Sequence, residues 1–218
     1  MSKILLETIN LRKTYKHVNG NINLFNNLNL KIKQGDLVAL VGPSGSGKSS
    51  LLHLLALLDE PTKGDIKLNN VLTRKFADEK KDETRRKNIS IIFQDNNLLN
   101  DFTAIENVMM PLIIKGINTL NAKKEAQKIL KAVKISNRSH HFPNELSGGE
   151  QQRVAIARAI AMKPELILAD EPTGNLDTEN SIMISKILFQ YVKEEGSSLI
   201  MVTHDPKLAN KAKRKIRI

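Results

Sequence analysis

The stretch that decides the fold is GPSGSGKS, residues 42–49. It matches the pattern GxxxxGK[ST], in which glycines let successive backbone N–H groups turn inward and form an anion-binding concavity. An apolar run at 37–41, LVALV, has the length of a buried parallel strand, and residues 49–58 follow with helical apolar spacing. Strand, glycine loop and helix N-terminus are therefore consecutive, which is the arrangement that binds the phosphates of a nucleotide.

The loop residues predict specific contacts with a nucleoside triphosphate. Lys48 would place a compact ammonium near the outer phosphates, and the Ser49 hydroxyl could ligate Mg²⁺. The alternative is a Gly/Ser-rich turn before a helix, which we disfavour because the motif is complete and its context is correct. The candidates for nucleotide contacts in this loop are Gly42, Pro43, Ser44, Gly45, Ser46, Gly47, Lys48, Ser49 and Ser50.

Length and composition limit the organisation of the chain. With 218 residues it can bury one core with an insertion, and it is too short for two full domains. Its apolar runs fall far short of the roughly 20 residues needed to cross a bilayer. The N-terminal segment MSKILLETIN lacks a signal-peptide apolar region, so we expect the protein to stay where it is made. The absence of cysteine excludes disulfides and thiolate metal sites.

The net charge of +11 allows two interpretations. It could indicate a nucleic-acid partner or a nearby anionic membrane surface. It could also reflect a lysine-rich composition without any specific partner. The charges are dispersed over many segments and aromatic residues make up only 4% of the chain, so we favour the second interpretation and expect no direct nucleic-acid partner.

Alternating apolar positions at 4–11 and 24–32 predict antiparallel strands with one solvated face. Tyr15 lies between these two segments. Its ring could stack on a purine or pack on the edge of a sheet, and the stretch itself does not decide between the two.

Polar residues follow further apolar runs at positions where parallel strands would end. Residues 89–93, 166–170 and 199–203 predict buried strands. In open α/β sheets ligands bind at the carboxyl ends of the strands. Gln94 could then contact both Mg²⁺ and an attacking water. His204 could hydrogen-bond the γ-phosphate and that water, or simply cap the end of a strand.

The apolar run LILAD ends in Asp170 and is followed directly by Glu171. Asp170 is placed to hold Mg²⁺ through water, and Glu171 to orient and deprotonate the attacking water as a general base. Pro172 predicts extended φ/ψ angles for Glu171. The predicted metal ligands are therefore Ser49, Gln94 and Asp170.

In the middle of the chain the hydrophobic pattern changes from that of strands to that of helices. Residues 98–114 and 122–135 have helical apolar spacing and predict an inserted helical subdomain. Its apolar side chains could form a groove for a partner helix or simply fill a core, and both possibilities stay open. The mixed-charge run at 74–88 predicts a solvated helix or loop.

The segment LSGGEQ at 146–151 predicts a second phosphate-binding helix terminus. Ser147 and Glu150 have the spacing of a capping box, and Gly148 and Gly149 leave the amides uncovered. A phosphate loop followed by LSGGE is the signature of the ABC-type ATPases, and the sequence resembles that family over nearly its whole length.

The resemblance implies an α/β fold of the P-loop NTPase class, with a RecA-like core, an N-terminal antiparallel β subdomain and an inserted helical subdomain. It implies one ABC ATPase domain over residues 1–218. The core and the β subdomain would occupy 1–94 and 152–218, and the helical subdomain, ending in the signature, would occupy 95–151.

In this family two copies pair head to tail, and the signature of one copy closes on the γ-phosphate of ATP held by the other. By this resemblance, Ser147, Gly148, Gly149 and Glu150 bind ATP in trans. Asn175 and Asp177 lie in NLD, which resembles the family's loop that touches the opposite subunit. His204 matches the family's switch histidine.

Longer stretches resemble one subgroup, the ATPase subunit of the bacterial lipoprotein-releasing system. They are SKILLE, LLHLLALLDEPTKGD, LLNDFTAIENVMMPL, and PNELSGGEQQRVAIARA with LADEPTGNLD. This implies ATP hydrolysis with Mg²⁺, two integral-membrane permease subunits docked on the helical subdomain, a lipoprotein substrate handled by the permease, and a peripheral position on the cytoplasmic face of the inner membrane. The ATPases of macrolide-export and cell-division complexes share many of these sequence segments and are the alternative assignments within the family. A soluble nucleic-acid-associated ABC ATPase is a further alternative.

Overall fold

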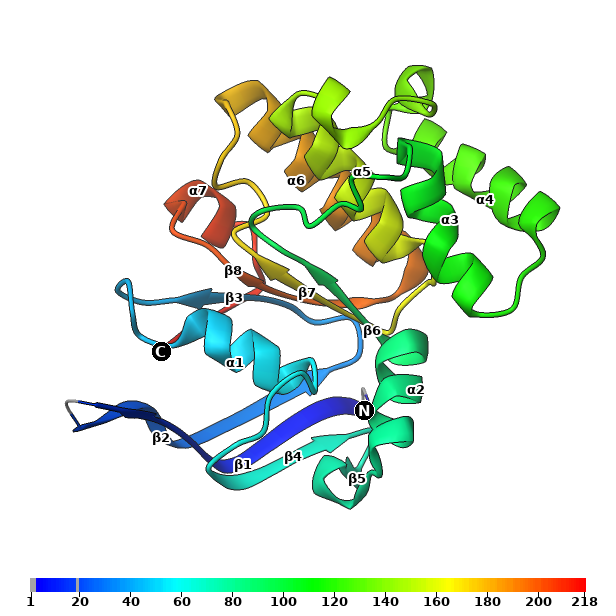
Figure 1. Cartoon of the computed structure of the whole chain (residues 1–218). Helices are drawn as coiled ribbons and strands as arrows, with labels where there is room; N and C mark the ends of the chain where they lie inside the picture. The colour runs from blue at the N-terminus through cyan, green and yellow to red at the C-terminus, as the bar shows by residue number, and fades with distance from the viewer. Residues whose placement is uncertain (1–2, 19) are drawn as a thin grey trace.

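The computed structural model describes residues 3–18 and 20–218. Two sheets form its framework (Figure 1). The parallel sheet has the strand order β6-β7-β8-β3-β9, and the antiparallel sheet has the order β2-β1-β4-β5. The parallel strands are Leu37–Val41 (β3), Ile89–Ile92 (β6), Leu166–Asp170 (β7), Ser198–Val202 (β8) and Arg214–Arg217 (β9). The antiparallel strands are Ile4–His17 (β1), Gly20–Lys33 (β2), Lys63–Leu68 (β4) and Val71–Leu72 (β5).

The α1 helix, Lys48–Leu55, lies between the two sheets (Figure 1). It is shorter than the predicted 49–58, because the chain turns after Ala56. Its leucines pack against both sheets in one apolar cluster, which includes Leu6 of β1 and Val38 of β3. The helix that follows the glycine loop is therefore anchored on both sides.

The opposite face of the parallel sheet is covered by α5, Gly148–Ile160, and α6, Thr178–Glu195 (Figure 1). Successive residues of β3 alternate between the two clusters, since Val38 and Leu40 face α1 whereas Ala39 belongs to the cluster that contains α5 and α6. Helices on both faces bury the central strands β7, β8 and β3, which explains why these are largely apolar runs, whereas the edge strand β9 is charged and mostly exposed.

The β1 strand is longer than predicted. Residues 12–17 were expected to connect two strands, but β1 runs unbroken to His17, and Tyr15 pairs with Ile22 of β2. The register of the β1–β2 pairing shifts at several points, including between Thr8 and Lys13, and the pairing continues beyond these irregularities to the end of the hairpin. Tyr15 is therefore fixed on a strand.

Three helices form the helical subdomain: α3, Ala104–Ile114, α4, Thr119–Ala132, and the first part of α5. The predicted boundary between 151 and 152 falls inside α5. The helix expected from residue 98 begins only at Ala104, because Thr103 and Glu106 form a capping box there. The preceding loop is held by the buried Asn107, which bonds both backbone groups of Leu99 and the carbonyl of Phe102.

The mixed-charge run contains a 3-10 turn, Thr73–Lys75, and α2, Asp78–Asn88. Only Thr84 of α2 is buried, so of the two predicted alternatives, a solvated helix or a loop, the structure has a solvated helix over Asp78–Asn88. Short elements complete the described chain: the 3-10 turns Ser136–Arg138 and Pro143–Glu145, and α7, Pro206–Ala209. Over residues 3–18 and 20–218, no helix combines the length and apolar character needed to span a bilayer.

Candidate functional site

The glycine loop has the backbone shape expected of a phosphate cradle. Gly45 and Gly47 adopt positive φ angles of 78° and 91°. A Cβ at Gly47 would lie 2.8 Å from the Cβ of Leu24, so a larger residue fits neither the conformation nor the space. Gly47 is also the N-cap of α1, and no side chain caps this helix. The first amides of α1 are therefore open to an anion.

Lys48 is buried at 5% exposure within the same loop. Its Nζ donates to the carbonyl oxygens of Gly42 at 3.0 Å and Pro43 at 2.7 Å. These bonds hold the ammonium along the loop, where it faces the cavity described next.

A cavity of about 720 Å³ gathers most of the predicted site residues. The glycine loop forms one wall, the carboxyl ends of β6, β7 and β8 contribute another, and the β1–β2 hairpin closes a third. The lining residues are Tyr15, Ile22, Leu24, Ser44, Gly45, Gly47, Lys48, Ser49, Ser50, Gln94, Asp170, Glu171, Gly174, Val202 and His204. This volume is within the range of small-molecule sites.

Four of these lining residues, Ile22, Leu24, Gly174 and Val202, were not predicted. Ile22 and Leu24 come from β2, and their place beside the glycine loop depends on how the hairpin folds over α1. No local pattern in the sequence reports that contact.

Glu171 does not adopt the extended conformation that Pro172 predicted. Its φ angle is 44°, in the left-handed region. Its N–H donates to the Val202 carbonyl at 3.1 Å, and its carbonyl accepts from the Gly174 N–H at 3.0 Å. These two bonds outweigh the preference set by the proline and turn the side chain toward the cavity.

The carboxyl of Glu171 is suited to accept a proton. Burial raises its pKa, and the hydrogen bond from the His204 N–H, at 3.2 Å from Oε2, partly opposes this shift. Its Oε1 is buried and makes no hydrogen bond within the described residues, although His204 Nε2 lies 3.4 Å away. A desolvated carboxylate with a free oxygen has the character of a general base.

His204 has an exposed ring, with 56% of its side chain accessible. It follows β8, as predicted, and the ring and backbone both approach Glu171. The histidine therefore lies beside the candidate base at the rim of the cavity instead of in the core.

Oxygen donors for a hard cation line the same cavity: the hydroxyl of Ser49, the amide of Gln94 and the carboxylate of Asp170. No group of three or more His, Cys, Asp and Glu side chains converges as a metal site in the described ranges. The donors present match the preference of Mg²⁺ for few protein oxygens together with phosphate oxygens.

The loop that follows Gln94 is held by a residue that sequence reasoning missed. Arg158 of α5 donates to the carbonyls of Asn96 at 2.8 Å and Asn97 at 2.6 Å, in the loop that follows Gln94. Burial lowers the pKa of Arg158. The only sequence signal was a charged residue within an otherwise apolar helix face.

The signature segment lies outside this cavity. Ser147, Gly148, Gly149 and Glu150 begin α5, and none of them is among the cavity's lining residues. The predicted capping box is confirmed, since Ser147 N donates to Glu150 Oε2 at 2.8 Å and Glu150 N donates to Ser147 Oγ at 3.3 Å. Gly148 instead lines a neighbouring pocket together with Gln94 and Glu171, so the start of α5 lies beside the cavity without forming part of its wall.

Two signature residues are engaged within their own chain. A Cβ on Gly148 would meet nothing within 4 Å, whereas one on Gly149 would lie 2.7 Å from the Asn180 side chain, so only Gly148 is open as predicted. Glu150 also accepts a bond from Arg138 Nε at 3.0 Å. Burial opposes ionisation of Glu150, but the bonds from Ser147 and Arg138 outweigh it and lower the pKa of the carboxyl.

The NLD loop joins β7 to α6. Asn175 is exposed. Asp177 is also exposed and caps α6, accepting a bond from the Asn180 N–H at 2.9 Å. Asn175 is therefore free to contact another molecule, while Asp177 also has a structural role.

Tyr15 forms part of the cavity wall opposite the glycine loop. The residue is 40% exposed, and its hydroxyl donates to Asp59 Oδ2 at 2.8 Å. Packing on a sheet edge and stacking on a base are thus not exclusive, because Tyr15 lies on a strand and still faces the cavity.

Comparison with known proteins agrees with this geometry. Residues 25–174 match the ABC transporter family. The lipoprotein-releasing system ATP-binding protein LolD of Pseudoalteromonas translucida (strain TAC 125) is 44% identical over 97% of this chain and 91% of its own length. LolD of Syntrophus aciditrophicus (strain SB) is 42% identical over 97% of this chain and 95% of its own length.

The fold also matches solved structures. The ATP-binding cassette MJ0796, in a dimeric post-hydrolysis state bound to ADP and Pi, superposes with a TM-score of 0.92 at 40% identity, covering 98% of this chain and 94% of that one. A dimeric structure of MJ0796 described as a bacterial ABC transporter cassette gives the same values. The sequence and the fold agree, and the chain belongs to the ABC transporter family, with the fold of its ATP-binding cassette.

Proposed function

We propose that the chain is the ATP-hydrolysing motor subunit of a bacterial inner-membrane ABC transporter. The observation that carries this proposal is the single cavity in which the glycine loop, an acidic pair and His204 meet. Such a site has the parts needed for phosphoryl transfer to water: donors for phosphate charge, a base, and a group that orients the base.

In the proposed reaction, the open amides of the loop and Lys48 bind the phosphates and neutralise their charge. Glu171 accepts a proton from the attacking water through its free carboxyl oxygen, and His204 holds the carboxyl and the γ-phosphate in register. Ser49, Asp170 and Gln94 would hold Mg²⁺, and the bound ion would supply neutralisation of phosphate charge. Tyr15 would stack on the adenine.

We further propose that two copies act together. The signature start of α5 is a helix N-terminus that the chain's own cavity does not use, and Gly148 is open to a ligand. In a head-to-tail pair, Ser147 and the signature amides of one copy would complete the phosphate site of the other, with Asn175 at the contact. ADP lacks the phosphate these amides recognise, so hydrolysis would reopen the pair.

Two integral-membrane permease subunits are the proposed partners, docked on the helical subdomain. This surface carries large apolar side chains that the core does not bury. Leu99 is 41% exposed, Phe102 37% and Ile114 54%. Exposed apolar groups on adjacent elements are typical of an interaction surface.

We propose lipoprotein release toward the outer membrane as the transported process, at the cytoplasmic face of the inner membrane. The support is the similarity to two LolD proteins named for a lipoprotein-releasing system, over nearly the whole chain. Substrate contacts would then belong to the permease, and this chain would supply ATP-driven movement.

The direct test is Glu171→Gln. The variant keeps the shape of the side chain but removes the base, so we expect ATP-dependent dimers with hydrolysis nearly abolished, measured by gel filtration and phosphate release. Lack of any dimer with ATP, alongside loss of hydrolysis, would refute the paired scheme.

The absence of native cysteine allows a second test on a clean background. A variant carrying Ser46→Cys and Gly148→Cys should crosslink between subunits when ATP is trapped, and each single variant should not. Stimulation of ATP hydrolysis by a membrane fraction, and recovery of a permease in a mild-detergent pull-down, would test the partner; stimulation by RNA or DNA alone would contradict it.

A further inference from the structure

The ring of Tyr15 is held by a polar cluster that the proposed reaction does not use. Its hydroxyl donates to Asp59 Oδ2 at 2.8 Å, and the Nζ of Lys13 donates to Asp59 Oδ1 at 2.7 Å. Lys13 and Tyr15 both belong to β1. Asp59 instead follows α1, the helix that carries the phosphate loop at its other end. The cluster therefore ties the tyrosine to that helix.

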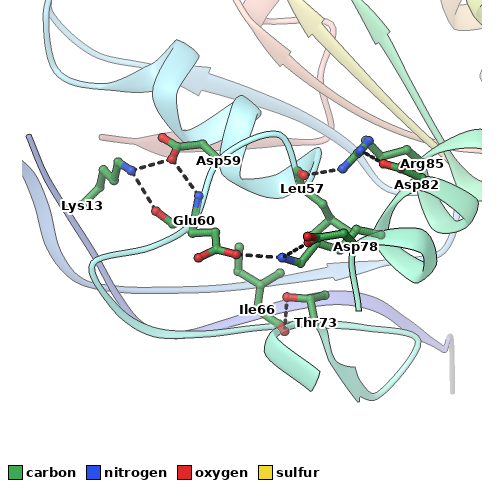
Figure 2. Close-up of polar contacts among 10 residues, drawn as sticks. Lys13, Leu57, Asp59, Glu60, Ile66, Thr73, Asp78, Asp82 and Arg85 are labelled. Carbon is green, nitrogen blue, oxygen red and sulfur yellow. Dashed lines mark hydrogen bonds and ion pairs between the residues drawn. The ribbon is translucent and has the colours of Figure 1, made fainter. Parts of the chain in front are cut away.

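Asp59 is itself fixed in place. Its Oδ1 accepts a second bond, from the Glu60 N–H at 2.7 Å, and Lys13 also donates to the Glu60 carbonyl at 2.8 Å. Figure 2 shows Lys13, Asp59 and Glu60 joined in this way. Burial opposes ionisation of Asp59, but bonds from Lys13 and Tyr15 outweigh it, so its pKa lies below the ordinary value. The acceptor for the tyrosine is thus a charged, immobilised carboxylate.

The cluster also extends to α2. The Glu60 carboxylate accepts from Lys81 Nζ at 2.7 Å, and Arg85 donates to the Leu57 carbonyl at 2.6 Å (Figure 2). The segment between α1 and β4 is therefore bonded on both sides, by β1 and by α2. These bonds restrain the position of the Asp59 carboxylate independently of the exposed tip of the β1–β2 hairpin.

Lys13 has a second effect on the ring. Its Nζ lies over the ring of Tyr15, 4.6 Å from the centroid. The ammonium is favourably placed for a cation–π contact and covers one face of the ring. The opposite face is the one left for a purine.

We propose that Asp59 is a positioning residue for nucleotide binding, which holds the ring of Tyr15 at a fixed place relative to the phosphate loop. This inference rests on the proposed function. A half-exposed tyrosine without this bond would sample several rotamers and lose that freedom when it stacks on a base. The bond to Asp59 restricts the rotamers of Tyr15 before ATP binds, so this entropy is not lost on binding. Asp59 and the phosphate loop lie at opposite ends of α1, so the helix fixes the ring of Tyr15 relative to the phosphate site.

The test uses Asp59→Ala, Tyr15→Phe and the double variant in ATPase assays. Loss of one charge-assisted hydrogen bond should raise KM for ATP roughly five- to tenfold. The kcat should stay within about twofold, because no group that touches the reacting phosphate is changed. The double variant should be no worse than Asp59→Ala alone, since both changes remove the same bond.

Inorganic tripolyphosphate separates positioning of the base from general damage. It has no base to stack, so its inhibition constant against ATP hydrolysis should be the same for the wild type and Tyr15→Phe. Glu125→Ala is the matched control, because it also removes a carboxylate that pairs with a lysine, Lys128 of α4, but Glu125 lies outside both the cluster and the cavity. Its KM should not change.

An unchanged KM in both Asp59→Ala and Tyr15→Phe would overturn the inference. So would an equal rise in the inhibition constant of tripolyphosphate, which would indicate a disturbed phosphate loop. If Asp59→Ala fails to fold, Tyr15→Phe alone decides, since it removes only the hydroxyl. A wild type that neither binds nor hydrolyses ATP would refute the proposed function itself, which is a different outcome.

Discussion

Replacing Gly149 by alanine should destabilise the folded chain through a clash inside one subunit. A Cβ at this position would lie 2.7 Å from the Cγ and Oδ1 atoms of Asn180. Asn180 cannot swing aside freely, because its Nδ2 donates to Asp177 Oδ2 at 2.6 Å and its Oδ1 accepts from Arg153 Nη1 at 3.1 Å. The alanine therefore has to break these bonds or displace the start of α5.

The magnitude follows from a comparison with Gly148→Ala. Both glycines lie in the first turn of α5, so alanine gains similar helix propensity at each, but a Cβ on Gly148 meets nothing within 4 Å. The difference between the variants isolates the Asn180 contact. Two lost hydrogen bonds are worth about 1–3 kcal/mol, which for a chain of this size is roughly 2–12 °C in Tm.

The assay is thermal unfolding without nucleotide, so that any role of the glycines in phosphate binding does not affect the measured Tm. We expect Gly148→Ala to equal or exceed the wild type in Tm and Gly149→Ala to fall below it. In an Asn180→Ala background the cost of Gly149→Ala should largely disappear, because the clashing atoms are gone. Equal Tm values for Gly148→Ala and Gly149→Ala, or an unchanged cost in that background, would refute the reasoning.

Substitutions at three further residues test other parts of the site. Glu171→Gln should raise Tm at neutral pH. Burial raises the pKa of this carboxyl in the folded state above its unfolded value, so the ionised carboxylate lowers the free energy of unfolding at pH values above the unfolded pKa. The gain in Tm should vanish at acid pH, where the carboxyl is protonated in both states. A gain that grows toward acid pH would contradict this sign. Lys48→Ala should raise the Kd for ATP roughly tenfold or more in a titration, because a charged donor to the phosphates is lost; a Kd near that of the wild type would remove Lys48 from the site. Arg158→Met should lower kcat with little change in the Kd for ATP, because the loop that follows Gln94 loses two hydrogen-bond donors. Arg158→Lys should restore part of the lost kcat. Equal kcat values for the wild type, Arg158→Met and Arg158→Lys would show that this loop needs no such support.

The parts of the site encoded in consecutive residues could be predicted from the sequence. The runs at 37–41 and 166–170 coincide with β3 and β7, because the buried positions of a central parallel strand must be apolar on both faces. The capping box at Ser147 was also predicted correctly, since both partners lie within one turn. In each case the physical cause is local.

Features that depend on distant partners could not be predicted. Pro172 favours extended backbone at Glu171, but the bond to the Val202 carbonyl, from a neighbouring strand, decides the conformation. Likewise, residues 98–103 have helical spacing, yet the buried side chain of Asn107 satisfies their backbone in a loop. No pattern within either segment reports these contacts.

The conformation of Glu171 connects the candidate base to the surface where a second copy is proposed to bind. Its positive φ, 44°, is unfavourable for a residue with a side chain, at a cost of roughly 1–2 kcal/mol, so surrounding bonds must maintain it. One of them comes from the Gly174 N–H, directly before the exposed Asn175. A partner that binds Asn175 would therefore act on the same turn that aims the carboxyl. A base whose orientation depends on this turn would be fully aligned only in the pair, which would couple hydrolysis to dimer closure without any additional residue.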